Sequence, residues 1–169
     1  MHGNPERTLL LAQSATFIAL LAAGAWVAIP VGPVPVTLQT FFLLLAAPVM
    51  KRRAFIPAAL YLLLGCLNLP VFHAGLSGVG VLLGPSGGFL VGFIPAATIA
   101  GLAYERKSRV LRIAGLAAGT ATVYACGVAW LLLSAGLTLP AAVLVGVLPF
   151  LPGDILKAAE VFLLGERLA

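Results

Sequence analysis

Long apolar runs, separated by short clusters of charged residues, prolines and glycines, occupy almost all of this 169-residue chain. A helix that crosses a bilayer needs about 20 mainly apolar residues. The runs predict six such helices, over about 8–29, 35–50, 54–69, 86–104, 113–135 and 140–165. The second and third runs are short and contain Pro48 and Pro57, so we expect tilted, kinked or irregular backbone there.

The composition agrees with a membrane location. Hydrophobic residues make up 62% of the chain and charged residues 9%, whereas water-soluble domains carry about 25% charged residues. The expected fold class is therefore an all-α integral membrane protein. No segment is polar enough to form a separate soluble domain, so residues 1–169 are expected to form a single transmembrane domain. The first run is longer than the apolar core of a signal peptide, and we interpret it as a retained helix.

Basic residues provide an independent test of the six-helix count. Nine of the ten lysines and arginines lie at helix ends that this count places on one face of the membrane: Arg7, Lys51, Arg52, Arg53, Arg106, Lys107, Arg109, Arg112 and Arg167. The opposite loops, at 31–34, 70–85 and 135–139, contain no lysine or arginine. The positive-inside rule then predicts that both ends of the chain are cytoplasmic. Topology and anionic lipid headgroups account for the net charge of +5 better than nucleic acid does.

Lys157 is the tenth basic residue, and together with Asp154 it lies inside the last apolar run. Residues at i and i+3 of a helix lie on nearly the same face, so both side chains can reach one ligand or each other. Charged groups in hydrocarbon are costly, and such residues usually mark functional sites. A purely structural salt bridge is the alternative interpretation.

The prolines before this pair predict an interrupted helix. Pro149 and Pro152 each lack a backbone donor, so we expect a break with a new helix N-terminus near residues 153–154. Broken helices near the middle of the membrane build solute sites in transporters. Glu160 either pairs with Lys157 or extends toward the cytoplasmic surface, and its role stays open.

Further polar groups lie where the predicted helices meet the external face. Thr37, Gln39 and Thr40 could bind a neutral polar ligand, although Thr37 could instead cap its helix. Asn68 could either end the third helix or border the same pocket. The external segments 29–36 and 69–88 are apolar yet rich in proline and glycine. Because such backbone cannot face lipid unpaired, we expect it to fold over the helix ends as a lid or pocket wall.

The other notable residues carry weaker signals. Cys66 and Cys126 lie inside apolar runs, and His2 and His73 stand alone, so no metal site is expected. The first run has alanines at four-residue spacing, a pattern that permits close approach of another helix: Ala15, Ala19 and Ala23. From spacing alone, that helix could belong to this chain or to another protein.

Four ordered motifs carry a resemblance that spans nearly the whole chain, at 29–40, at 61–65 with 69–72, at 84–93 and at 148–157. They include Pro-Val-Pro-Val-Thr-Leu-Gln-Thr in the first motif and Leu-Pro-Gly-Asp in the last. This order resembles the BioY family, the biotin-specific substrate-binding (S) components of energy-coupling factor (ECF) vitamin transporters. Three features depart from the family pattern and affect the loop contacts. Ser86 stands where the family commonly has threonine, and Asn68 and residues 73–78 differ from the usual glycine-rich sequence.

The resemblance implies a six-helix S-component fold in the cytoplasmic membrane, with biotin bound near the outer face by Asp154 and Lys157. It implies that the alanine stripe docks on a transmembrane coupling protein energised by two ATPase subunits. The expected ligand contacts, from the resemblance and from the polar groups above, are Asp154, Lys157, Thr37, Gln39, Asn68, Gly84, Gly87, Gly88 and Phe89. A carboxylate can accept the two N–H donors of the ureido ring, and an ammonium can donate to its carbonyl.

Three other functions are weighed against this one. The chain could be a stand-alone biotin carrier, an S component for another vitamin, or an enzyme that uses Asp154 and Lys157 as an acid/base pair. No nucleophile, metal cluster or phosphate-binding loop accompanies the pair. We therefore expect a transporter subunit that is not an enzyme, needs no cofactor and draws its energy from its partners.

Overall fold

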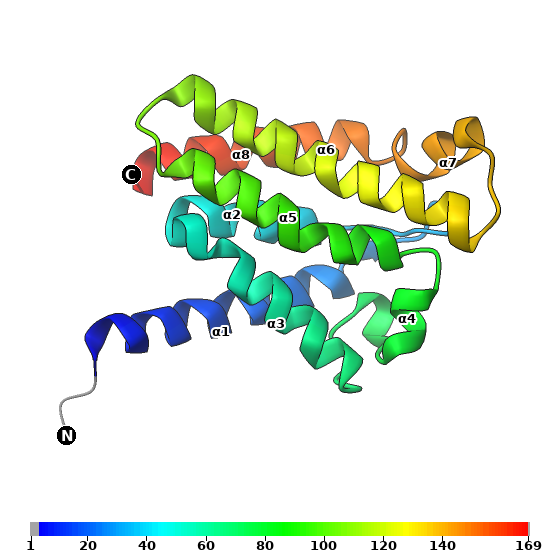
Figure 1. Ribbon diagram of the computed structural model, residues 1–169, viewed down its shortest axis with the longest axis horizontal. Helices are drawn as coiled ribbons and strands as arrows, with labels where there is room; N and C mark the ends of the chain where they lie inside the picture. The colour runs from blue at the N-terminus through cyan, green and yellow to red at the C-terminus, as the bar shows by residue number, and fades with distance from the viewer. Residues whose placement is uncertain (1–3, 169) are drawn as a thin grey trace.

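The computed structural model describes residues 4–168 and is almost entirely helical (Figure 1). The helices are α1 (Pro5–Trp26), α2 (Gln39–Met50), α3 (Phe55–Cys66), α4 (Val79–Leu83), α5 (Gly87–Tyr104), α6 (Arg109–Ser134), α7 (Leu139–Gly146) and α8 (Leu151–Leu168). Two short 3-10 helices are η1 (Lys51–Ala54) and η2 (His73–Gly75). Strands β1 (Ala28–Ile29) and β2 (Val36–Thr37) pair antiparallel. Capping residues begin two of the long helices: Asn4 accepts from the Glu6 amide, and Ser108 accepts from the Leu111 amide.

Among the described residues, α1, α5 and α6 are long and apolar enough to cross a membrane. The two helices α7 and α8 meet at a bend of 52° and together meet the same criterion, which gives up to four spans. Helices α2 and α3 have 12 residues each, or about 18 Å, well short of the ~30 Å hydrocarbon core. By length and composition, the structure therefore supports three or four of the six predicted spans.

The charged ends of the helices gather at one end of the molecule. Figure 1 shows the start of α1, η1, the α5–α6 turn and the end of α8 at the same end, opposite the hairpin, α4 and the α6–α7 connection. Ion pairs join these elements, from Arg52 to Glu105 and from Arg109 and Arg112 to Glu166. The basic clusters of the sequence thus form one basic end of the fold.

Helix α5 lies in the centre and packs along α6, with α2 and α3 on its other side (Figure 1). Small residues permit this close approach: a Cβ at Gly88 would collide with the Trp130 Cβ, and one at Gly101 would collide with the Lys51 carbonyl. The core around α5 is apolar and includes Phe93, Ala96 and Ala97. It forms the scaffold on which the remaining elements sit.

Two predicted helix boundaries are wrong because a hairpin replaces helix. The first run was expected to be helical to residue 29 and the second from residue 35, but α1 ends at Trp26 and α2 begins at Gln39. Pro30, Pro33 and Pro35 fall between these helices and disfavour helix. The chain instead pairs β1 with β2, and the Leu38 amide donates to the Gly24 carbonyl.

The predicted break in the last run is present but lies earlier than expected. Residues 147–150 separate α7 from α8, and α8 begins at Leu151 rather than near residues 153–154. Pro152 lies in the first turn of α8, where its missing N–H leaves no intrahelical bond unmade. Asp154 therefore also lies in that first turn.

The β1–β2 hairpin and residues 70–86 together cover one end of the helices, and we call them the cap. Two tryptophans tie the second segment to the long helices: Trp130 Nε1 donates to the Gly84 carbonyl at 2.9 Å, and Trp26 Nε1 donates to the Pro70 carbonyl at 3.4 Å. This confirms the expectation that the proline- and glycine-rich segments fold back over the helix ends.

Candidate functional site

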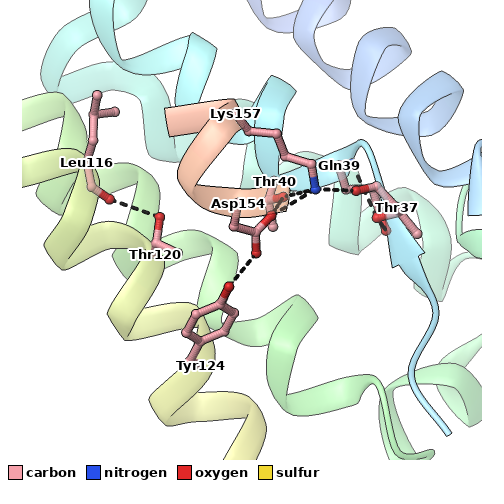
Figure 2. A network of polar contacts seen from close by, with 8 residues as sticks. All are labelled: Thr37, Gln39, Thr40, Leu116, Thr120, Tyr124, Asp154 and Lys157. Atoms are coloured by element: carbon pink, nitrogen blue, oxygen red, sulfur yellow. Dashed lines mark hydrogen bonds and ion pairs between the residues drawn. The ribbon is translucent and has the colours of Figure 1, made fainter. Parts of the chain in front are cut away.

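The centre of the candidate site is a buried ion pair near the start of α8 (Figure 2). Lys157 Nζ lies 2.8 Å from Asp154 Oδ1, and the two residues are 9% and 2% exposed. The i, i+3 spacing produces this geometry, as the sequence predicted. Asp154 also benefits from its place in the first helical turn, where the helix dipole favours negative charge.

Three further groups satisfy the two charges. Thr40 Oγ1 donates to Asp154 Oδ1 at 2.8 Å, and the Tyr124 hydroxyl donates to Asp154 Oδ2 at 2.7 Å. Lys157 Nζ donates to the Thr37 carbonyl at 2.7 Å and to Thr40 Oγ1 at 3.0 Å. Figure 2 shows the resulting junction of α8, α6 and the start of α2. A buried ion pair is tolerated when its remaining donors and acceptors are paired in this way.

A second polar chain connects this junction to the cap. Gln39, 4% exposed, donates from Nε2 to the Tyr61 hydroxyl at 2.7 Å, and that hydroxyl donates to the Val71 carbonyl at 2.7 Å. Thr37 Oγ1 donates to Gln39 Oε1 at 3.0 Å. The position of the cap is thus linked through α3 to the residues around Lys157.

A cavity of about 50 Å³ lies between the ion pair and the cap. Its walls are formed by Val34, Pro35, Thr37, Gln39, Thr40, His73, Ser86, Phe89, Leu90, Phe93, Val123, Tyr124, Phe150, Asp154 and Lys157. The Phe89 and Phe150 rings stack with their centroids 6.2 Å apart. His73 Nε2 lies 3.5 Å from Ser86 Oγ in the cap. The cavity therefore combines charged, amide, hydroxyl and aromatic groups at the covered end of the bundle.

A family model described as the BioY family matches residues 4–169. The chain belongs to the BioY family. It is 41% identical over 160 residues to "Biotin transporter BioY" of Thermotoga maritima, with 94% of each chain covered. It is 38% identical to "Probable biotin transporter BioY" of Pyrococcus horikoshii, with 91% of this chain and 92% of the relative covered.

A solved structure has the same fold as this BioY chain. It is described as the crystal structure of the S-component for biotin from an ECF-type ABC transporter, and it aligns with a TM-score of 0.88 and 26% identity. The alignment covers 99% of this chain and 94% of that one. The family consists of transporter components, which confirms the prediction that the chain is not an enzyme.

Five of the predicted ligand residues line the cavity: Asp154, Lys157, Thr37, Gln39 and Phe89. They come from β2, α2, α5 and α8. The structure thus brings together residues that are up to 120 positions apart in the sequence.

The other four predicted ligand residues lie outside the cavity lining. Asn68 is exposed and takes a left-handed φ of 67° just after α3, so it ends that helix. Gly84 accepts the Trp130 indole, Gly87 packs against the Leu82 backbone, and Gly88 lets α6 approach α5. These glycines shape the cap and the scaffold.

The three alanines of the first-helix stripe, Ala15, Ala19 and Ala23, are all exposed. The opposite face of α1 provides its buried residues, including Phe17 and Leu21. Among the described residues, the stripe therefore does not pack against another helix of this chain. Glu160 is also exposed and lies outside the cavity lining.

Sequence reasoning missed several lining residues. Tyr124 is a single hydroxyl-bearing ring in the apolar run that forms α6, and that interruption was the available signal. Thr40 was noticed but was not chosen as a ligand contact. His73, Ser86 and Phe150 reach the cavity only through the fold of the cap and the α7–α8 break, which no spacing rule predicts.

No metal centre accompanies the site in the part of the chain that the structure describes. Within residues 4–168, no three His, Cys, Asp or Glu side chains lie close enough together to hold a metal ion. His2 lies outside the described residues.

Proposed function

We propose that this chain is a biotin-binding S component, which captures biotin on the external side and delivers it to the cytoplasm with an ATP-driven ECF module. The observation that carries the proposal is the buried Asp154–Lys157 pair at the cavity floor, in a member of a family whose curated relatives are named biotin transporters.

The chemistry of the site matches the polar groups of biotin. The ureido ring offers two N–H donors and one carbonyl acceptor. Asp154 with Lys157 provides the complementary set when the ligand replaces part of their bonds to Thr37, Thr40 and Tyr124. Thr37, Gln39 and Tyr124 add hydroxyl and amide groups beside the pair. Each buried polar group that stays unpaired costs about 1–3 kcal/mol, so this match favours biotin over an apolar ligand. Phe89, Phe93 and Phe150 are suited to the sulfur-containing ring and the aliphatic chain.

Binding requires the cap to move. A cavity of about 50 Å³ is far smaller than the ~300–1,000 Å³ of typical small-molecule sites. The cap is the covering that an enlarging cavity must displace. It is held by hydrogen bonds from Trp26, Tyr61 and Trp130 and by the buried Phe72 ring. We therefore propose that the hairpin and residues 70–86 move outward as the ligand enters.

The membrane arrangement that we propose has six crossings in the cytoplasmic membrane, with both ends of the chain cytoplasmic. Helices α2 and α3 cross as two short segments on either side of Lys51–Ala54, and α7 with α8 form one bent crossing. The basic end then faces the cytoplasm and the cap faces outward, in agreement with the positive-inside rule.

The exposed alanine stripe of α1 is proposed as the surface that meets the coupling protein. Small side chains at four-residue spacing permit close helix packing in a bilayer. Because Ala15, Ala19 and Ala23 are exposed, they are available to another protein. The two ATPase subunits would then act through that coupling protein.

Titration of the purified protein in detergent with biotin, thiamine and riboflavin tests the proposal. We expect saturable binding of biotin alone. Uptake of labelled biotin into proteoliposomes should require the coupling protein and both ATPases. Absence of biotin binding would contradict the ligand assignment, and full uptake without the module would instead identify a stand-alone carrier.

A further inference from the structure

A groove on the side of the molecule, between α6 and α8, has no role in the proposed biotin site. Its volume is about 490 Å³, much larger than the cavity under the cap. Six residues of α6 and six of α8 line it, in order along each helix: Ile113, Leu116, Ala117, Thr120, Ala121 and Tyr124, then Leu151, Asp154, Ile155, Ala158, Ala159 and Phe162.

The groove runs along the helices from the basic end to the middle of the fold. Arg112 pairs with Glu166 at one end and Tyr124 bonds Asp154 at the other, so the two helices are antiparallel. Residues 113–124 span about 17 Å at 1.5 Å per residue. One leaflet of the hydrocarbon core is about 15 Å thick. The groove therefore has the length of a single leaflet.

The lining of the groove is apolar apart from its inner end and Thr120, whose hydroxyl already donates to the Leu116 carbonyl. Alanines occupy its middle, and Ala117, Ala121 and Ala159 are exposed. The only charged lining residue is Asp154, whose carboxylate oxygens already accept from Thr40, Tyr124 and Lys157. An occupant therefore needs no polar group inside the groove.

Basic residues surround the cytoplasmic mouth of the groove. The Arg109 side chain is 77% exposed one turn before Ile113, and Arg106 and Lys107 are exposed beside it. Within residues 4–168, Glu166 is the one carboxylate that pairs with Arg109 and Arg112, so positive charge is in excess among the described side chains there. This charge is complementary to an anionic headgroup at the membrane surface.

We propose that the α6–α8 groove binds one acyl chain of an anionic phospholipid, with the headgroup against Arg109 and its basic neighbours. The end of the chain lies against Tyr124 and Asp154, on the outer side of the wall of the biotin cavity. This inference rests on the proposed membrane orientation but not on the identity of the vitamin.

Native mass spectrometry of delipidated protein tests the inference. The protein is titrated with phosphatidylglycerol or with phosphatidylcholine of the same acyl chains. We expect the wild type to bind one phosphatidylglycerol several-fold more tightly than phosphatidylcholine. Ala121→Phe, which fills the groove, should reduce phosphatidylglycerol binding at least fivefold, and Arg109→Gln should remove most of the preference for the anionic lipid.

The matched control is Ala118→Phe, an exposed position of α6 outside the groove lining, which should behave as wild type. Ala159→Phe fills the groove from α8 and replaces Ala121→Phe if that variant does not fold. Equal lipid binding by the groove-filling variant and Ala118→Phe would overturn the proposal. Loss of a dimer in the groove-filling variant alone would also overturn it, because a second copy would then be the occupant.

Biotin titrations of the same samples separate the two proposals. Lipid binding that follows the expected pattern in a protein that does not bind biotin would leave the groove assignment standing and remove the proposed function. Biotin binding without selective lipid binding would leave the proposed function standing and remove the groove assignment.

Discussion

The two faces of α6 are held by different physical means. Toward α5, glycines let the backbones approach, and a Cβ at Gly88, Gly115 or Gly127 would collide with the facing helix or with Phe89. Toward α8, the helices are joined by polar contacts at two levels, Tyr124–Asp154 and Arg112–Glu166, with the groove between them. Close packing therefore joins α6 to α5, whereas polar contacts join α6 to α8. The close apolar packing of α8 is made on its other side, where Val161 and Gly165 lie against α2 and Tyr104.

The largest expected effect follows from filling the α5–α6 interface. In Gly88→Leu the new side chain would collide with Trp130, and even its Cβ would lie 2.5 Å from the Cys126 carbonyl oxygen. Overpacking against backbone cannot be relieved by a rotamer change. We expect loss of folded, monodisperse protein in size-exclusion chromatography.

The matched control for this substitution is Gly153→Ala in α8, where a Cβ meets nothing within 4 Å. Alanine is favoured over glycine in a helix by about 0.5–1 kcal/mol, so its unfolding temperature should rise slightly. If Gly88→Leu and Gly153→Ala had the same melting temperature, the proposed contrast between the two faces would be wrong.

The ion pair should give the next largest effect. Asp154→Asn or Lys157→Met alone leaves the other group buried without its charged partner, which costs about 3–5 kcal/mol. The double variant removes both charges and should recover most of that loss. Thermal unfolding in detergent measures all three variants. Additive losses in the double variant would show that the two charges are not coupled.

The ion pairs of Glu166 at the basic end of α8 should contribute less to stability than the Asp154–Lys157 pair. Glu166→Gln removes the carboxylate that pairs with Arg109, which is exposed, and with Arg112; Glu166 and Arg112 are half-buried. Ion pairs at the edge of a fold contribute little and are screened by salt. We expect a small decrease in unfolding temperature at 50 mM NaCl that disappears at 1 M, and a decrease that persists at 1 M would point to packing instead of charge.

The smallest expected effect is a pH dependence in the cap. Burial lowers the pKa of His73 below its ordinary value of about 6.5, so the folded cap holds a neutral imidazole. The neutral imidazole therefore gives its full stabilisation at pH values above the ordinary pKa of about 6.5. That stabilisation is lost as the pH falls from the ordinary pKa to the lower pKa of the folded state. When the pH is lowered from 7.5 to 5, the unfolding temperature of the wild type should therefore fall slightly more than that of His73→Gln. Parallel pH curves for the two proteins would contradict this assignment.

The sequence predicted the parts of the fold that depend on local pattern. The apolar runs located α1, α5 and α6 and the broken last run, and the i, i+3 spacing paired Asp154 with Lys157. The proline clusters predicted where helices are interrupted. They did not predict which structure replaces the helix, because a hairpin and a loop both satisfy the same steric restrictions.

The rest of the site depends on contacts between distant elements. Tyr124 meets Asp154 because of how α6 lies beside α8, and His73 reaches the cavity through the path of the cap. Asn68 lies outside the cavity lining, and its left-handed φ of 67° ends α3. None of these positions follows from periodicity or spacing.

The most direct test of the central claim is a biotin titration of the double variant Asp154→Asn/Lys157→Met beside wild type, after both have been shown to be folded. If the pair is the biotin site, the variant keeps a cooperative unfolding transition but loses at least 100-fold in affinity, since each of two lost charge-assisted bonds contributes about 1.5–3 kcal/mol. A folded double variant that binds biotin as tightly as wild type would show that the pair only stabilises the fold.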